Sequence, residues 1–339
     1  MNYYFAPLEG ITGYTYRRAH NKYFGGIDKY YIPFVAAHSS RNLKTREKED
    51  IAPKNNEGMN AVPQVLTNNA DNFIWVAKEI ADLGYKEVNF NLGCPAGTIV
   101  SKKRGSGFLA YPDELDAFFD KVFNGLKDVD IDISVKTRIG LNSADEAARI
   151  FEIYDKYPIS ELIVHPRTRK QMYSGKPDME AFGQIAATSK HKLCFNGNLC
   201  TPDDIQNFAD RFPEIDCVMM GRGLLSNPAL AAMSKIRYSG EISTTNSGNE
   251  LTSHINSGLN ADGSVNLKVL KAFHDELYNE YLETMPGDMV AVNRMKELWK
   301  YMGNLFEAPD KAMKDIRKAN TPAAYVSAIR VLFSSGKLK

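Results

Sequence analysis

Short hydrophobic runs recur along roughly the first 235 residues, and most are followed by a segment whose hydrophobic positions repeat with the period of a helix. This alternation is typical of a parallel sheet with crossover helices. Helices are predicted at 12–24, 69–83, 112–126, 144–156, 179–188 and 202–211, with a poorer connection between the second and third strands. The strands are predicted at 3–8, 29–35, 61–66, 87–92, 132–137, 161–165, 192–196 and 217–220.

Strands of this number and spacing fit a (β/α)₈ barrel, whose usual length is about 250 residues. The alternative is a doubly wound open sheet. We favour the barrel because polar residues stand at nearly every carboxyl end of a strand, and only a barrel brings those ends to one mouth. These residues are Glu9, Gln64, Asn91, Cys94, Lys136, Arg138, His165, Arg167, Asn196, Gly221 and Arg222.

The pattern changes after residue 238. Residues 239–266 are rich in Ser, Gly, Asn and Thr, which is typical of a linker or a loop insertion. Helical periodicity then runs from Leu267 to Phe333. We therefore predict a barrel domain at 1–238, a polar linker or insertion at 239–266, and a small all-α domain at 267–339.

The composition is that of a globular protein, because 43% of the 339 residues are hydrophobic and 24% are charged. The net charge of +1 provides no overall attraction for a polyanion, but the cations are unevenly placed. The helical segment 268–339 has 12 basic and 9 acidic side chains. Three groups are predicted on loops that follow strands: Arg41, Lys44, Arg46 and Lys48; Lys102, Lys103 and Arg104; and Arg167, Arg169, Lys170 and Lys176. A basic rim around the mouth would contact phosphates locally.

Four cysteines without a CxxC pair indicate neither a disulfide scaffold nor a zinc site. No segment has the composition of a signal peptide or a membrane span, so we expect a cytoplasmic protein without a membrane partner or a metal. The Rossmann glycine motif, the phosphate-binding P-loop and the nucleophile elbow are also absent. The sequence does not determine the oligomeric state, although a monomer is favoured.

The most specific string is NFNLGCP at 89–95, in which Cys94 follows the fourth strand on a tight Gly-Cys-Pro turn. A thiol titrates near pH ~8.5, so at neutral pH it can donate a proton. The alternative is a structural cysteine, which the place after a polar strand end disfavours. Cys194 and Cys217 lie inside hydrophobic strands and are predicted to be core residues.

Glycine turns follow the seventh and eighth strands, as Asn196-Gly197-Asn198 and Gly221-Arg222-Gly223. Loops at these two positions form the usual phosphate site of the barrel fold, so a phosphate-bearing cofactor is predicted. Lys136 on an inward strand position implies a charged or electron-rich ligand, with an ion pair to Glu9 or a neighbouring carboxylate as the alternative. His165 is a candidate ligand or a packed imidazole. The amides of Gln64 and Asn91 suit an imide or uracil-like edge.

Taken together, these motifs resemble the tRNA-dihydrouridine synthases. The likeness covers nearly the whole barrel and ends in a helical domain. Its motifs are APLEGIT at 6–12, PQV at 63–65, NFNLGCP at 89–95, VKTRIG at 135–140, HPRTR at 165–169 with YSG at 173–175, NGN at 196–198 and GRG at 221–223.

The resemblance implies an FMN-dependent oxidoreductase that reduces the C5–C6 bond of selected uridines in tRNA, with NADPH as the reductant. It implies that Cys94 is the general acid and that Lys136 stands beside the flavin. It implies substrate contacts by Asn91, Arg138, Arg167, Arg169 and, in the helical domain, Lys296. The implied cofactor contacts are Pro7, Leu8, Glu9, Gln64, Lys136, His165, Asn196, Gly197, Asn198, Gly221 and Arg222.

The chain departs from the family pattern at Leu8, Pro166 and Asn198, where Met, Gly and an acidic residue are usual. Two alternatives stay open. A flavin barrel that acts on a small molecule, similar to dihydroorotate dehydrogenase, would share the phosphate turns and the cysteine but would not need the helical domain. A catalytically silent RNA-binding barrel would leave Cys94 and Lys136 unexplained.

Overall fold

Eight parallel strands close into a barrel in the order of the chain. The computed structural model describes residues 1–37, 41–239 and 258–339. The predicted barrel and its eight strands are confirmed. The strands are β1 (Asn2–Phe5), β2 (Lys29–Ala36), β3 (Ala61–Leu66), β4 (Glu87–Leu92), β5 (Asp132–Arg138), β6 (Leu162–His165), β7 (Leu193–Asn196) and β8 (Cys217–Met220).

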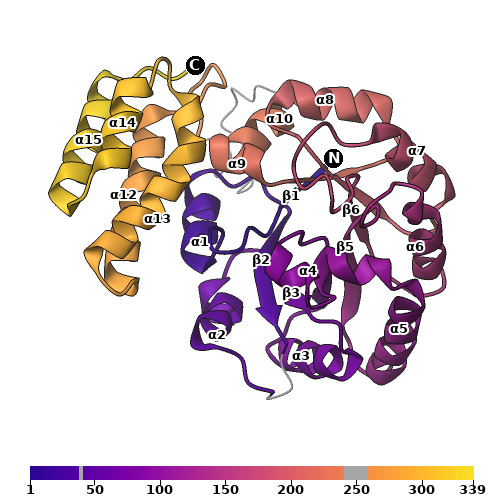
Figure 1. Cartoon of the computed structure of the whole chain (residues 1–339). Helices are drawn as coiled ribbons and strands as arrows, with labels where there is room; N and C mark the ends of the chain where they lie inside the picture. The colour runs from indigo at the N-terminus through magenta and orange to yellow at the C-terminus, as the bar shows by residue number, and fades with distance from the viewer. Residues whose placement is uncertain (38–40, 240–257) are drawn as a thin grey trace. The chain divides into compact units, whose positions relative to one another are not determined.

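The six predicted helices of the barrel region are present, and side-chain caps fix the start of α3 and α7. Asn69 caps α3 by accepting a hydrogen bond from the backbone N–H of Asn72 at 2.9 Å. Helices α3, α5, α6 and α7 lie outside the strands (Figure 1). The bounds are α1 (Tyr14–Tyr23), α3 (Ala70–Asp82), α5 (Pro112–Leu126), α6 (Glu146–Tyr154), α7 (Met179–Thr188) and α8 (Pro202–Arg211), with the shorter α4 (Gly97–Val100) and η2 (Gly105–Ala110) after β4.

The connection between β2 and β3 contains a helix that the sequence pattern did not predict. It is α2 (Thr45–Ile51), followed by η1 (Pro53–Asn55). Six of its seven residues are polar or charged, so no hydrophobic stripe marks it. Its start is fixed by the Glu47 carboxylate, which accepts a hydrogen bond from the Lys44 backbone N–H at 2.9 Å. The prediction that Arg46 and Lys48 lie on a loop was therefore wrong.

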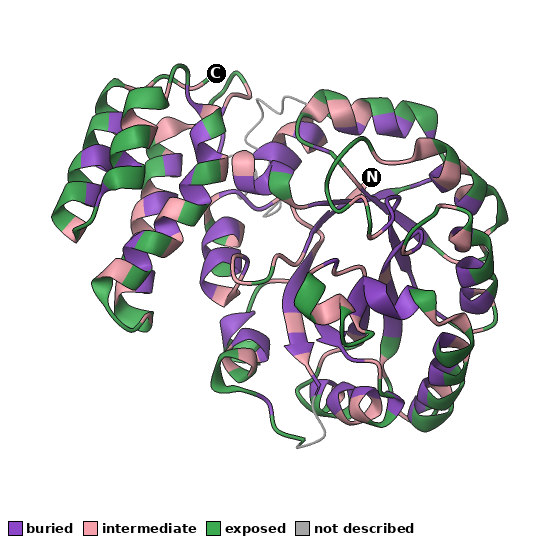
Figure 2. Cartoon of the chain, in the orientation of Figure 1, coloured by how far each residue is buried: buried purple, intermediate pink, exposed green. Residues whose placement is uncertain are grey.

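The strands are almost entirely buried (Figure 2). Inside the barrel a hydrophobic cluster includes Tyr4, Tyr31, Ile163, Cys194 and Cys217. Neither Cys194 nor Cys217 has any exposed surface, which confirms that they are core residues. The reactive candidate Cys94 is only half-buried, so burial separates it from the two core thiols.

The described chain forms two compact units, and we treat each by itself. The first comprises Met1–Glu9, Lys29–Asn198 and Ala209–Met219, and the second comprises Gly10–Asp28, Leu199–Phe208 and Met220–Lys339. The second holds α9 (Arg222–Ser226), α10 (Leu230–Ser239), α12 (Leu267–Thr284), α13 (Asp288–Met302), η3 (Gly303–Leu305), α14 (Asp310–Lys318) and α15 (Pro322–Ser335). Helices α12 to α15 form the predicted all-α bundle (Figure 1).

Helix α1 belongs to the helical unit rather than to the unit that holds most of the barrel. Its Tyr16 and the following Phe24 pack edge to face on Phe273 of α12, with ring centroids 5.6 and 5.2 Å apart. The Thr15 hydroxyl donates to Glu280 at 3.0 Å. The compact units therefore do not divide at residue 238, where the composition changes. Most of the predicted linker, residues 240–257, lies outside the described residues.

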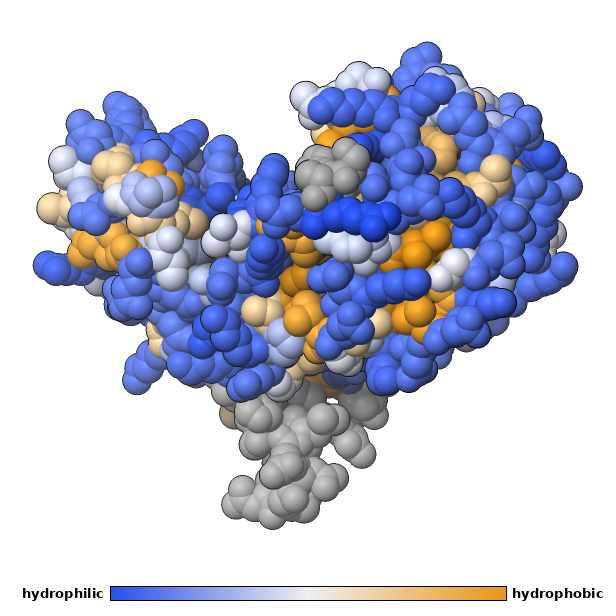
Figure 3. All heavy atoms as spheres, turned by 90° about the horizontal axis from the view of Figure 1, so that it is seen from below, coloured by the Kyte–Doolittle hydropathy of each residue, from blue (hydrophilic) through white to orange (hydrophobic). Residues whose placement is uncertain are grey.

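In the part of the chain that the structure describes, no helix combines the length and the hydrophobicity needed to span a membrane. The face drawn in Figure 3 is mostly hydrophilic, with hydrophobic residues visible between polar ones.

Candidate active site

Cys94 stands on a turn at the carboxyl end of β4 that three side-chain hydrogen bonds hold in place. The Asn91 side-chain oxygen accepts from the backbone N–H groups of Gly93 and Cys94, at 3.1 and 2.9 Å. The Ser106 hydroxyl donates to the Cys94 carbonyl at 2.9 Å. At Gly105, which has φ +56°, a Cβ would lie 2.8 Å from that carbonyl, so this close approach requires glycine.

Burial raises the pKa of the Cys94 thiol above its ordinary value. The positive charges of Arg138 and Lys136 act in the opposite direction but are weaker influences. The side chain therefore holds a proton at neutral pH while remaining half-buried rather than enclosed. Such a group suits proton donation better than nucleophilic attack.

The predicted amides Asn91 and Gln64 lie side by side. The Asn91 side-chain NH₂ donates to the Gln64 side-chain oxygen at 2.6 Å. The Gln64 NH₂ in turn donates to the side-chain oxygen of Asn89 at 2.7 Å. The cysteine turn and both predicted amides are therefore one hydrogen-bonded assembly.

Lys136 is a cation without a countercharge. Its Nζ donates to the side-chain oxygen of Asn196 at 2.7 Å, and Asn196 is held by the Met219 carbonyl at 2.8 Å. Burial, assisted by the charge of Arg138, lowers the pKa of Lys136 to about 7. Glu9 forms its ion pair with Arg46 instead, at 3.0 Å, and among the described residues no carboxylate pairs with Lys136. An anionic ligand would supply the missing charge.

Arg138 is 1% exposed and connects two loops. It donates to the carbonyls of Gly93, Thr168 and Met172, at 2.9, 3.0 and 2.8 Å. Its guanidinium stands 5.4 Å from the ring centroid of Tyr173, whose side chain is 53% exposed. Tyr173 was not a predicted site residue. An exposed aromatic in the loop after β6 was the signal that could have identified it.

Arg167 has no exposed surface, although the charge pattern placed it on a solvated rim. It donates to the carbonyls of Ser174 and Gly175 at 3.2 and 2.6 Å, and to Asn198 at 3.2 Å. It also meets His165 Nε2 at 2.9 Å. Because a guanidinium only donates, Nε2 accepts and the proton of a neutral His165 is on Nδ1. Arg167 therefore shapes the loop after β6.

Arg169 differs from its neighbour. Its Nε is buried and, within the described residues, has no hydrogen-bond partner. A buried donor without an acceptor is costly, so this atom favours a ligand oxygen nearby. Lys136 and the amides make the mouth of the first unit suitable for an oxygen-rich anionic group, as the predicted FMN is.

The remaining predicted residues fall in separate places. Pro7 and Leu8 are half-buried after β1, and Gly197 is half-buried after β7. Gly221 and the exposed Arg222 belong to the second unit, where Arg222 begins α9. At Gly223 a Cβ would lie 2.1 Å from the Leu199 carbonyl, so glycine is required there. The Lys296 ammonium donates to the Ala319 carbonyl just after α14, which gives it a structural contact.

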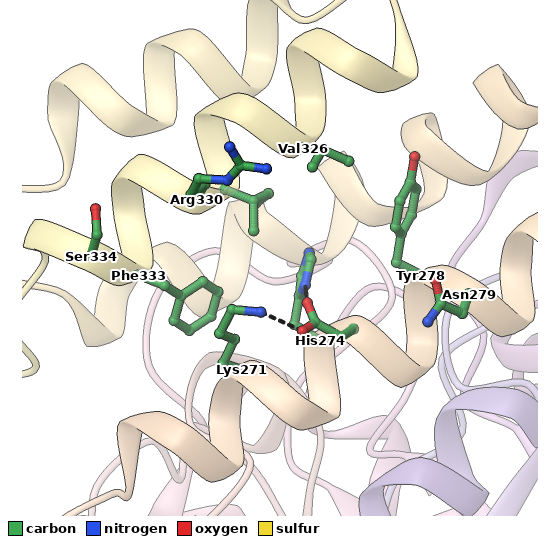
Figure 4. Close-up of a pocket in the computed structure, with 10 residues that line it drawn as sticks. Lys271, His274, Tyr278, Asn279, Val326, Arg330, Phe333 and Ser334 are labelled. Carbon is green, nitrogen blue, oxygen red and sulfur yellow. Dashed lines mark hydrogen bonds and ion pairs between the residues drawn. The ribbon is translucent and has the colours of Figure 1, made fainter.

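The helical unit contains a cavity of about 520 Å³ between α12 and α15 (Figure 4). His274 and Lys271 line it from α12, and Arg330 lines it from α15. The His274 ring bonds to Asp275 at 2.9 Å and to the Tyr325 hydroxyl at 2.7 Å, and burial lowers its pKa. None of the predicted site residues lines this cavity. No cluster of potential metal ligands is found in the described residues.

The comparisons with known proteins decide the family. The family model described as dihydrouridine synthase matches residues 4–261. This chain belongs to the dihydrouridine synthase family. It is 26% identical over 228 residues to tRNA-dihydrouridine synthase B of Pasteurella multocida, covering 67% of each chain. It is 27% identical over 231 residues to a tRNA-dihydrouridine(16) synthase of Pseudomonas putida, covering 66% of this chain and 70% of the relative.

Solved structures add support for the fold alone. A 2-naphthoyl-CoA reductase aligns with a TM-score of 0.53 at 13% identity, over 71% of this chain and 50% of that one. Histamine dehydrogenase from Rhizobium sp. 4-9 aligns with a TM-score of 0.51 at 10% identity, over 70% and 46%. The chain thus spans about half the length of these two proteins.

Proposed function

We propose that this chain is a tRNA-dihydrouridine synthase, which reduces the C5–C6 bond of uridines in tRNA with FMN as cofactor and NADPH as reductant. Family membership and the names of its relatives support the reaction. The observation that carries the proposal is the barrel mouth itself. There a protonated thiol and two linked amides stand in one hydrogen-bonded assembly, and Lys136, a cation without a countercharge, is the register partner of Asn91 on the neighbouring strand.

The FMN, when bound, supplies the hydride that is added to C6 of the uracil. Lys136 supports an anionic cofactor by charge, and Gln64 and Asn196 would contact it through their amides. The other proposed cofactor contacts are Pro7, Leu8, Glu9, His165, Gly197, Asn198, Gly221 and Arg222. Asn198 is neutral where the family usually has an acid, but its side-chain oxygen accepts a hydrogen bond from Arg167 and so still acts as an acceptor.

Cys94 would deliver the proton that completes the reduction. As hydride is added to C6, the Cys94 Sγ–H bond breaks and its proton goes to C5, which leaves a thiolate that solvent reprotonates. Burial favours this role because the raised pKa keeps the thiol protonated before the reaction. The hydrogen bonds from Asn91 and Ser106 fix the turn, so the thiol is held in one position.

The uracil must leave the base stack to reach the mouth. Asn91 and Arg138 are proposed to hold its polar edge, and the exposed ring of Tyr173 offers a flat face beside Arg138. Arg169 is proposed as a phosphate or substrate contact. Arg167 and Lys296 are proposed to act indirectly, because Arg167 has no exposed surface and the Lys296 ammonium donates to the Ala319 carbonyl. The excess of basic residues at 268–339 supports contact of the helical unit with tRNA.

The test is formation of dihydrouridine by the purified full chain. We expect a yellow protein that, with NADPH, reduces uridine in an unmodified tRNA transcript and shows no reduction when NADPH is omitted. Orotate, which would be reduced to dihydroorotate at the same C5–C6 bond, and related small molecules are assayed in parallel. A colourless protein that cannot be reconstituted with FMN would contradict the proposal, as would reduction of the small molecules without reduction of tRNA.

A further inference from the structure

A chain of buried side chains runs through the barrel interior to the mouth. The Ser134 hydroxyl lies 2.6 Å from the Glu87 carboxylate, and the Asn89 NH₂ lies 2.8 Å from Ser134. Gln64 and Asn91 continue it at 2.7 and 2.6 Å. Asn89 and Ser134 have no exposed surface, and Gln64 and Asn91 are 1% and 7% exposed. Each of the four links is a direct contact between side chains.

The strand register explains how the chain forms. Residues 87, 89 and 91 alternate along β4, so their side chains share one face. Asn89 is the register partner of Gln64 in β3 and of Ser134 in β5. Polar side chains on three neighbouring strands therefore meet inside the barrel.

The Glu87 end of this series of hydrogen-bonded side chains fixes the direction of every hydrogen bond in the series. Glu87 is paired with Lys29 at 2.6 Å, and an ionised carboxylate only accepts. Ser134 therefore donates to Glu87 and accepts from the NH₂ of Asn89. The Asn89 oxygen must then accept from Gln64, which turns the Gln64 oxygen toward Asn91.

The Asn91 end of the series, at the barrel mouth, independently gives the same direction of hydrogen bonding. Backbone N–H groups only donate, so Gly93 and Cys94 hold the Asn91 oxygen against the turn. The Asn91 NH₂ must then face Gln64 and the mouth. Both lone pairs of the Asn91 oxygen are used, and one of its two N–H groups has no acceptor among the described residues.

We propose that Ser134 and Asn89 are positioning residues, which transmit the acceptor character of Glu87 to Gln64, so that the Gln64 oxygen faces Asn91 and supports the donor orientation that the cysteine turn gives to Asn91. The site thereby selects a carbonyl oxygen over an amino group at that point of the ligand. The assignment of that ligand as uracil rests on the proposed function. The hydrogen-bond direction does not, and it can be tested on the free enzyme.

The test uses Gln64→Glu, which replaces the amide by a carboxyl group of the same shape. While that carboxyl is protonated it can donate to Asn89 as the Gln64 amide does, but once ionised it cannot. Ionisation would turn the Asn89 amide over, so that its NH₂ group faces the new carboxylate and its oxygen faces Ser134. The single hydroxyl proton of Ser134 would then face two acceptors, the Asn89 oxygen and the Glu87 carboxylate. In Gln64→Glu combined with Glu87→Gln, the new amide at position 87 can donate to Ser134 and still accept from Lys29. The reversed chain is then fully bonded.

The quantity measured is the pKa of the carboxyl introduced at position 64, from the pH dependence of unfolding of the full chain and from NMR of the labelled carboxyl. We expect the Glu87→Gln background to lower that pKa by about one pH unit or more. If only the double variant folds above pH 7, that rescue also supports the proposal. Failure of both variants to fold at any pH would contradict it.

Removing the charge of Glu87 would itself lower the pKa of the carboxyl at position 64, so Ser134→Ala is added to both backgrounds. Without the Ser134 hydroxyl, the residue at position 87 cannot set the hydrogen-bond direction of Asn89. The difference in the pKa of the carboxyl at position 64 between the Glu87 and Glu87→Gln backgrounds should then fall to the part caused directly by the charge of Glu87. Ser234→Ala is the matched control, because Ser234 is also buried but donates to the Leu230 carbonyl in α10. A difference unchanged by Ser134→Ala would overturn the proposal and leave the proposed reaction untouched.

Discussion

Two buried hydrogen-bond networks lie in the two units of this chain, and they end differently. In the barrel, the hydrogen-bonded side chains from Glu87 to Asn91 end at the mouth, where one N–H group of Asn91 has no acceptor among the described residues. The cation Lys136, which has no carboxylate partner there, lies beside it. In the helical unit, Trp299 donates to Tyr325 at 2.9 Å, and Tyr325 bonds to His274, which bonds to Asp275.

The helical network is closed. The Trp299 N–H, the Tyr325 hydroxyl and the His274 ring all have partners inside the protein, and Lys271 pairs with Asp275. Satisfied buried groups stabilise one arrangement of helices. At the barrel mouth, one N–H group of Asn91 has no acceptor and the charge of Lys136 has no carboxylate partner among the described residues. Unused hydrogen-bonding capacity, rather than the mere presence of buried polar groups, marks the site.

The largest expected effect concerns the charge at the mouth. Lys136→Met should weaken FMN binding about a hundredfold or more, because a buried ionic contact is lost. In the wild-type protein the cation is present below pH 7 and is lost above it, since its pKa is about 7. The Kd for FMN, from fluorescence titration of the apoprotein, should therefore rise between pH 6 and 8.

In Lys136→Met the Kd should be nearly independent of pH over that window. Lys86→Met is the control, because Lys86 pairs with Asp130 at an exposed position. An unchanged Kd in Lys136→Met would show that the charge at the mouth does not serve the cofactor.

The helical unit should lose stability in acid. Burial lowers the pKa of His20 from 6.5 to about 4, and the pKa of His274 is also lowered. Between these values the unfolded chain binds protons that the folded chain does not, so this stability is present above pH 6.5 and lost as pH falls toward 4. His20 alone should lower the unfolding free energy by about 2 kcal/mol between pH 7.5 and 5. Urea unfolding measures this, and a curve that rises toward acid pH would refute it.

A smaller effect is expected from opening the closed network. Tyr325→Phe leaves the Trp299 N–H and His274 Nε2 without their partner, which should cost about 1–2 kcal/mol of unfolding free energy. Thermal unfolding measures the loss. FMN binding should not change, because none of the proposed cofactor contacts belongs to this network. A weaker affinity of Tyr325→Phe for FMN would contradict the distinction between the helical network, whose groups all have partners, and the barrel network, which has an unused donor.

The strands and the motif residues of the site could be predicted because each is encoded locally. Strand positions follow from hydrophobic runs, and the mouth residues follow from strand ends. Helix α2 was missed because its stability comes from a cap at Glu47 and from its surroundings rather than from a hydrophobic stripe.

The partners of the charged residues could not be predicted. Arg167 and Lys296 bond to backbone carbonyls, which no side-chain pattern encodes. The direction of the amides also depends on Ser134 and Glu87, which come from different strands. The place of α1 in the helical unit depends on its contacts with Phe273, far along the chain.

The most direct test of the central claim is a single turnover without oxygen. Enzyme with reduced flavin is mixed with unmodified tRNA, and flavin oxidation and dihydrouridine are followed together. Wild-type protein should form one dihydrouridine per flavin oxidised. Cys94→Ala should retain its flavin but react about 10²-fold more slowly or worse, because the proton donor is lost. Dihydrouridine formation at the wild-type rate in Cys94→Ala, or none in the wild-type protein, would contradict the account.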